Sequence, residues 1–331
     1  MQEAFRVSGP LASPHLQTLW GPLLRRSPAV ERRAERLSLD DGDHLWLWHA
    51  GPRPGSGKPL VLLLHGLAGC EDSHYVRALQ ARLSQANVPS CVACARGAGN
   101  RPNDRARTWH AGETADVRRV IEHLAETAPS SPLLAAGFSL GGSQLLNLLT
   151  EPHPPQLQAA AAVSVPLRLA PCADRLDQGL SRLYRNHLLR QLVASLEAKK
   201  THLRRQAPAE ARRLDALGDP GRLRTFREFD NAVIAPLHGF RDAGDYYARC
   251  STADRLGDIG TPLLLIHALD DPFMTPDVIP PRERMSPLVQ PEITERGGHV
   301  GFVAGSPLRP RYWLEERLLR WVREYSGTAF P

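Results

Sequence analysis

Apolar residues follow two patterns that alternate along the chain. Short continuous apolar runs are separated by longer segments in which apolar residues recur at helical spacing. That alternation is typical of β-strands joined by crossover helices in a mostly parallel sheet. It predicts strands within residues 60–64, 88–95, 132–138, 157–166 and 262–269, and a final strand within 290–298.

Helical spacing and one turn signal fill the intervals between these strands. Residues 35–50 alternate Leu and Trp with polar residues about a "DDGD" turn, which predicts an antiparallel hairpin at the start of the sheet. We therefore expect an α/β fold with a twisted, mostly parallel central sheet flanked by helices. The predicted helices lie within 73–87, 113–127, 143–149 and 312–325.

The strand rhythm stops between Pro166 and Ser251, where Leu, Arg and Ala dominate and apolar residues follow helical spacing over 174–196. An insertion of this kind between two strands predicts a helical cap over one end of the sheet. We expect the segment near the N-terminus to wrap around the core or to contribute to the cap. The predicted division is a core of residues 1–165 and 252–331, with 1–30 as the wrapping segment, and a cap insertion of residues 166–251.

Charge changes this picture only locally. The chain has 331 residues, is 42% hydrophobic and carries a formal charge of +6, and residues 182–227 hold twelve basic side chains against four acidic ones. A solvated helical face is the commoner explanation of such a segment, although it would also suit peripheral contact with an anionic membrane. We expect no nucleic-acid partner, because no aromatic ladder or binding motif accompanies the arginines.

Neither secretion nor membrane insertion is indicated. The N-terminus lacks the basic start and apolar segment of a signal peptide, and no apolar run approaches the length of a membrane span. Cys91 and Cys94 should point to opposite faces of one strand, so we expect reduced thiols in a soluble, cytoplasmic protein. The thirteen histidines show no metal-binding spacing, and we expect no metal and no cofactor.

A candidate nucleophile stands in "GFSLGG", where Gly137, Ser139 and Gly141 form a G-x-S-x-G motif. The motif follows a predicted strand and opens a predicted helix, which is the context of a nucleophile elbow. The turn is so sharp that side chains on either side of the serine must be almost absent. The serine hydroxyl would then lie at a helix N-terminus, whose dipole favours developing negative charge.

A serine hydroxyl needs a base to take its proton, and His299 in "ERGGHVGF" is the candidate because it follows the last predicted strand. Donors for an oxyanion would be the backbone N–H groups of Leu140, next to the serine, and of Leu67, in the loop after "LVLLLHGLAG". His65 could be mistaken for a second base, but its position suits a brace for that loop.

Together these residues resemble the α/β-hydrolase superfamily, and several stretches resemble its YheT-like branch of esterases and lipases. The resemblance covers nearly the whole chain and includes motifs of the cap, which hydrolases in general do not share. The stretches that carry it are "SPHLQTLWGPLLRR", "HGLAGCEDSHYVRAL", "ARGAGNRPNDRARTWHAGETADV", "GFSLGGSQLLNLL", "VSVPLRLAPCADRLDQGLSRLYRNHLLRQL", "FREFDNAVIAPLHGFRDAGDYY", "ALDDPFMTP" and "ERGGHVGF".

The resemblance implies a serine hydrolase that cleaves carboxylic esters, including medium- or long-chain acyl esters or lipids, through an acyl-enzyme. Alcohol acyl transfer with the same triad is one alternative, and a non-catalytic homologue that binds a ligand in the same pocket is another. Membrane-anchored relatives carry an additional apolar N-terminal segment that this sequence does not show. The oligomeric state is not predicted.

The resemblance also bears on the adjacent acids Asp270 and Asp271, which follow the predicted strand at 262–269. In this superfamily the acid that orients the histidine lies in the loop after the penultimate strand, three positions beyond a small residue and before a turn with proline. Ala268, Asp271 and Pro272 fit that spacing. We therefore favour Asp271 as the triad acid, with Asp270 as the alternative. If Asp271 has that role, Asp270 is expected to cap the turn or pair with a cation.

Overall fold

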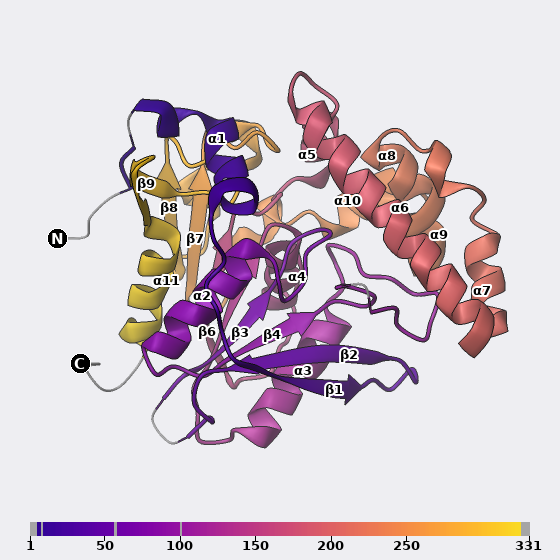
Figure 1. The fold of residues 1–331 in the computed structure, drawn as a ribbon, viewed down its shortest axis with the longest axis horizontal. Coiled ribbons are helices and arrows are strands. Elements are labelled where there is room, and N and C mark those ends of the chain that lie inside the picture. The colour runs from indigo at the N-terminus through magenta and orange to yellow at the C-terminus, as the bar shows by residue number, and fades with distance from the viewer. Residues whose placement is uncertain (1–4, 8, 56–57, 100, 326–331) are drawn as a thin grey trace.

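The centre of the molecule is an eight-stranded sheet (Figure 1). The computed structural model describes residues 5–7, 9–55, 58–99 and 101–325. The strands are Arg32–Ser38 (β1), His44–Ala50 (β2), Leu60–Leu64 (β3), Ser90–Cys94 (β4), Leu133–Phe138 (β5), Leu157–Val163 (β6), Leu263–Ala268 (β7) and Val289–Thr294 (β8). Their order is β1-β2-β4-β3-β5-β6-β7-β8. Only the pairs β1–β2 and β2–β4 are antiparallel within this sheet, so the predicted α/β class is confirmed.

Helices cover both faces of the sheet, which explains why its central strands are apolar throughout. One face packs against α3 (Ala115–Thr127) and α4 (Leu140–Leu149), and the other against α2 (His74–Gln85) and α11 (Trp313–Glu324). Cys91 belongs to the first core cluster and Cys94 to the second, as expected for opposite faces of β4. All five cysteines are free thiols.

The prediction of a final strand within 290–298 was wrong in one respect. β8 lies there, but β9 (Val303–Ser306) and β10 (Arg309–Tyr312) follow and form a separate antiparallel pair. Both strands have only four residues. β9 is exposed at its last two positions, and β10 contains a proline and has no buried residue, so neither strand shows an apolar pattern in the sequence.

The connection from β6 to β7 is helical. We call its helices the cap, and they bury an apolar cluster of their own. The predicted helical run over 174–196 is interrupted before Ser181, where Gly179 adopts a positive φ of 50°. The cap helices are Leu169–Leu176 (α5), Ser181–Gln206 (α6), Pro208–Asp215 (α7), Phe226–Phe229 (α8), Ala235–His238 (α9) and Ala243–Cys250 (α10), on the right of Figure 1.

The N-terminal segment contacts both the core and the cap. It contains η1 (Gly9–Ala12), α1 (Pro14–Leu19) and the π-helical turn η2 (Trp20–Leu24). The buried side chain of Gln17 donates to the carbonyl of Val303 at 2.8 Å and accepts the N–H of the same residue at 2.7 Å. His15 meets Tyr184 of α6 at 3.0 Å. Among the described helices, none combines the length and apolarity that a membrane span requires.

Candidate active site

Ser139 occupies a strained turn between β5 and α4. Its φ of 51° and ψ of −123° are rare for a residue with a side chain, and its N–H donates to the carbonyl of Val163 at 2.9 Å. A Cβ on Gly137 would lie 2.7 Å from the carbonyl oxygen of Gly141, and a Cβ on Gly141 would lie 2.3 Å from that of His65. The two glycines are therefore required for the turn that exposes the hydroxyl.

Ser139, His299 and Asp271 form a continuous chain of hydrogen bonds. His299 Nε2 lies 3.0 Å from Ser139 Oγ, and His299 Nδ1 lies 2.8 Å from Asp271 Oδ2. Because the carboxylate can only accept, it holds the proton on Nδ1 and leaves Nε2 free to accept one. The three side chains follow β5, β7 and β8, whose carboxyl ends share one edge of the sheet. This arrangement can remove the proton from Ser139.

The structure separates the two adjacent aspartates. Asp271 is almost fully buried, and its second oxygen accepts the N–H of Phe273 at 2.8 Å, while the Phe273 ring stacks on His299 with 4.0 Å between centroids. Asp270 turns away from the imidazole and accepts the N–H of Gly298 at 2.9 Å. Burial raises the pKa of Asp270, against the opposing effect of backbone donors. Asp270 thus supports the loop that carries His299.

The N-terminal segment holds the same loop from the other side. Thr18 Oγ1 accepts the N–H of His299 at 2.9 Å. Gly298 adopts a positive φ of 58°, and a Cβ there would lie 2.6 Å from the carbonyl oxygen of Pro14. Sequence reasoning missed the part played by Thr18, because no local pattern relates a residue of α1 to a loop 281 positions away.

The predicted oxyanion donors lie beside Ser139. Leu140 is the first residue of α4, so its N–H has no partner within the helix. A Cβ on Gly66 would lie 3.0 Å from the Cβ of Ser139, which places the following residue, Leu67, at the same opening. His65 is buried, with Nδ1 2.8 Å from the carbonyl of Gly66 and Nε2 accepting the backbone N–H that follows β4. With both ring nitrogens engaged, His65 braces the loop, and burial lowers its pKa.

A pocket of about 890 Å³ lies between the cap and the sheet edge and includes Ser139 and His299 in its wall. That volume falls within the range of small-molecule sites. Its wall is mainly apolar, and both Leu67 and Leu140 face it. The cap contributes a row of leucines to it, among them Leu169, Leu176, Leu188 and Leu192.

The cap also places two buried titratable groups in the pocket wall. Asp230 accepts a hydrogen bond of 2.6 Å from the hydroxyl of Tyr247, yet burial raises the pKa of Asp230 to about 7. Lys199 donates to the carbonyl of Arg107 at 2.9 Å, and burial lowers the pKa of Lys199 to about 7. Sequence reasoning found neither group, because each lies on a helix whose orientation depends on packing.

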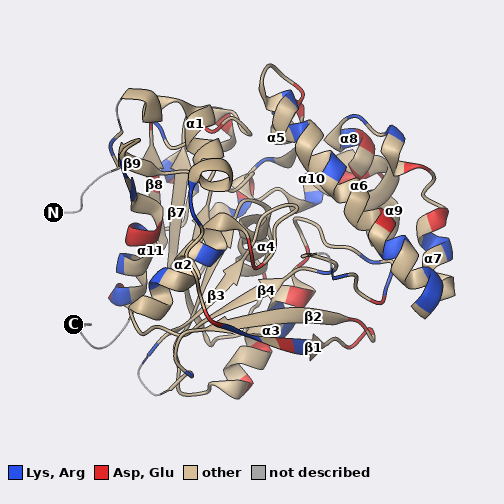
Figure 2. Cartoon of the chain, viewed as in Figure 1, with Lys and Arg blue, Asp and Glu red and all other residues tan. Residues whose placement is uncertain are grey.

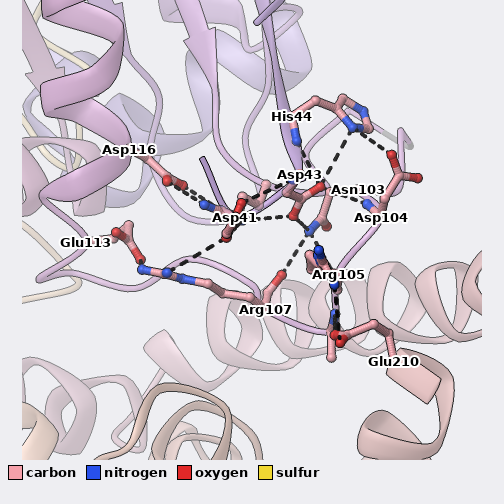
Figure 3. A network of polar contacts seen from close by, with 12 residues as sticks. Asp41, Asp43, His44, Asn103, Asp104, Arg105, Arg107, Glu113, Asp116 and Glu210 are labelled. Carbon is pink, nitrogen blue, oxygen red and sulfur yellow. Dashed lines mark hydrogen bonds and ion pairs between the residues drawn. The ribbon is translucent and has the colours of Figure 1, made fainter. Parts of the chain in front are cut away.

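A buried ionic network joins the cap to the core (Figure 3). Arg96, directly after β4, donates to Asp41 and Asp43 of the β1–β2 turn and, through two nitrogens, to Asp116 of α3. Although burial opposes its charge, the hydrogen bonds that Arg96 donates to the carboxylates of Asp116 and Asp41 raise the pKa of Arg96. The contact with the cap is made by the backbone N–H of Ala106, which donates to the carboxylate of Glu210 on α7 at 2.7 Å.

Two clusters have the side-chain types of a metal site, but their ligand atoms are already engaged. His110, Glu113 and His238 bring their ligand atoms within 4.8 Å of one another, yet an arginine pairs with Glu113 at 2.5 Å and the hydroxyl of Thr108 lies 2.9 Å from His238. In the cluster of Asp43, His44 and Asp104, the carboxylate of Asp43 accepts from Arg96, Asn103 and backbone N–H groups. Neither set offers a cation free lone pairs in the way a metal centre does.

The chain is similar to known proteins in sequence and in fold. The family model of the α/β hydrolase fold matches residues 59–306. The chain is 37% identical over 313 residues to the Escherichia coli (strain K12) protein named "Putative esterase YheT", covering 94% of this chain and 90% of that protein. It is 31% identical over 315 residues to the Bos taurus protein named phospholipase ABHD3, covering 93% and 75% of the two chains. A solved structure of the Pyrococcus furiosus esterase Pf2001 is similar with a TM-score of 0.58, 16% identity and 99% coverage of both chains, which bears on the fold.

Proposed function

The chain belongs to the α/β-hydrolase fold family and is an ester hydrolase, and we propose that it cleaves carboxylic esters through an acyl-enzyme formed on Ser139. The observation that carries the proposal is the hydrogen-bonded relay from Ser139 through His299 to Asp271, set in the wall of a large apolar pocket. The residues of the relay come from three separate loops, and a structural role for the serine would not require a base at 3.0 Å.

In the proposed mechanism, Ser139 Oγ attacks the ester carbonyl while His299 Nε2 takes its proton. Asp271 stabilises the imidazolium that forms. The backbone N–H groups of Leu67 and Leu140 donate to the oxyanion. The alcohol then leaves with the proton from Nε2, and a water molecule activated by the same nitrogen hydrolyses the acyl-enzyme.

The pocket supports an acyl chain of medium or long length as the substrate class. We further propose that residues 166–251 act as a cap that shapes this acyl pocket, since the leucines of α5 and α6 line it. A cytoplasmic location is part of the same proposal, because reduced thiols are typical of that compartment and all five cysteines are free.

Labelling by a fluorophosphonate probe tests the nucleophile. The folded native protein should be labelled, and Ser139→Ala should not. A native protein that stays unlabelled would favour a non-catalytic homologue, and equal labelling of the Ser139→Ala variant would place the reactive residue elsewhere.

A chain-length series of nitrophenyl esters, run beside glycerolipids, tests the substrate class. We expect kcat/KM to rise by about fourfold for each added methylene until the pocket is filled, because each buried methylene contributes about 0.8 kcal/mol. A maximum at acetate would contradict the proposed acyl pocket. Addition of an alcohol acceptor would measure acyl transfer in the same assay.

A further inference from the structure

Solvent-exposed leucines surround the mouth of the pocket. On the N-terminal segment Leu23 and Leu24 are 70% and 59% exposed, and on the cap Leu180 and Leu183 are 61% and 66% exposed. Leu23, Leu180 and Leu183 also line the pocket that contains Ser139. Single exposed leucines are ordinary, but three of them from two segments at one opening, with Leu24 adjoining Leu23 in the chain, form an apolar patch. We call these four residues the leucine patch.

The two segments that carry the leucine patch are held together. His15 of α1 meets the hydroxyl of Tyr184 on α6 at 3.0 Å, and their rings stack with 5.8 Å between centroids. Figure 1 shows α1 and α5 along the same, upper edge of the molecule. The end of η2 is anchored as well, because Arg25 lies 3.5 Å over the ring of Tyr312 and pairs with Glu315. The leucines are therefore presented on a fixed backbone.

Basic side chains border the leucine patch. Arg26, Arg182 and Arg190 are exposed, and none of them has an ion-pair partner among the residues that the structure describes. Arg190 follows Leu183 by seven positions on α6 and so lies on the same helix face. Figure 2 shows further Lys and Arg along α6 and α7. An apolar patch with a cationic border is complementary to a bilayer that contains anionic lipid.

We propose that the leucine patch docks this protein on an anionic lipid surface, with the mouth of the pocket facing the bilayer. The leucines would enter the boundary between head groups and acyl chains, while the arginines contact anionic head groups. An ester held in the membrane could then enter the pocket without crossing bulk water. This docking goes beyond the proposed ester cleavage and does not require the acyl-enzyme, because it concerns the outer rim of the pocket.

Co-sedimentation of the full chain with phosphatidylcholine vesicles, with and without phosphatidylglycerol, tests the docking. The Leu24→Gln/Leu183→Gln double variant should bind vesicles at least roughly tenfold more weakly, since each leucine loses its apolar transfer and net charge is unchanged. Leu308→Gln is the matched control. Leu308 is 94% exposed in the turn between β9 and β10 and does not line the pocket, so its variant should bind as the native protein does.

Two arginine variants of α6 test whether vesicle binding depends on where the positive charge lies. Arg182→Gln, at the patch, should weaken binding to phosphatidylglycerol vesicles by about fivefold, which corresponds to about 1 kcal/mol for one basic residue near an anionic surface. Arg205→Gln removes an exposed arginine at the other end of the same helix and should change binding by less than about twofold. Equal effects of the two variants would indicate unspecific attraction and overturn the docking geometry.

Three further outcomes would overturn the proposal. The first is that the native protein does not bind phosphatidylglycerol vesicles, and the second is that Leu308→Gln loses as much binding as the double variant. The third is a lipid-free dimer that the double variant converts to a monomer, since the leucine patch would then be covered by a second copy. Ser139→Ala should bind vesicles as the native protein does, so failure of docking and failure of ester cleavage remain distinguishable.

Discussion

The carboxyl edge of the sheet and the cap build their parts of the site in different ways. At the sheet edge, Ser139, Asp271 and His299 each follow a strand, and the register of the four adjacent strands β5 to β8 fixes their separation. In the cap, Asp230 and Lys199 lie on helical segments far apart in the sequence, and only packing brings them to one pocket.

Because of this difference, we expect the sheet edge to determine the reaction chemistry and the cap to determine the other properties of the site. A relay in which each atom must be placed within a few tenths of an ångström benefits from a rigid parallel sheet. A pocket wall that selects an acyl chain needs only volume and apolarity, which helices supply. Substitutions at the sheet edge should therefore lower kcat, whereas substitutions in the cap and its connections should alter stability or pH response.

The largest expected effect separates the two adjacent aspartates. Asp271→Asn should lower kcat by about 10⁴, by analogy with other triads, because the imidazole loses its orientation and charge partner. Asp270→Asn is the matched control and should lose less than about tenfold, because the amide oxygen can still accept from Gly298. Steady-state kinetics on one ester would check this. A larger loss at Asp270 would reverse the assignment of the acid.

The next effect concerns the ionic network that connects cap and core. Arg96→Met should lower the free energy of unfolding by about 3–5 kcal/mol, because it leaves Asp43 and Asp116 buried without their cation. Arg36→Met provides the comparison, since Arg36 is half exposed and its pair with Asp104 should contribute less than about 1 kcal/mol. Thermal unfolding would measure both. Similar midpoints for the two variants would mean that the network does not stabilise the fold.

A smaller effect is expected where the N-terminal segment meets the loop that carries His299. Thr18→Val keeps the shape of the side chain but removes the acceptor for the His299 N–H. It should cost about 1–3 kcal/mol of stability and lower kcat more than it raises KM, since the loop positions the imidazole. Thr127→Val, at an exposed hydroxyl near the end of α3, should change neither kinetic constant. An unchanged kcat in Thr18→Val would limit the segment to a structural role.

The smallest effect tests the buried carboxyl of the cap. The pKa of Asp230 is raised to about 7 from its ordinary 3.8, so the folded state retains a proton that the unfolded chain releases. As pH rises through that interval, the buried carboxyl lowers the free energy of unfolding by a growing amount, and above the interval this loss stays constant. Asp230→Asn should stabilise the protein more at pH 8 than at pH 5, by on the order of 1 kcal/mol.

The structure brings the predicted site residues together where local backbone rules fix their positions. The G-x-S-x-G motif located Ser139 because the elbow excludes side chains at Gly137 and Gly141. The spacing after β7 favoured Asp271, which the structure brings to 2.8 Å from His299. The short pair β9 and β10 was missed because it lacks an apolar pattern.

The sequence by itself determined the strand and helix pattern and the order of the candidate triad, since strand ends and elbows are properties of contiguous residues. Only the tertiary structure decided that Thr18 holds the loop of His299, that Arg96 ties the β1–β2 turn to α3, and that two leucine-bearing segments share one pocket mouth. Each of these depends on contact between segments far apart in the chain. Such contacts result from packing and desolvation, which no local periodicity encodes.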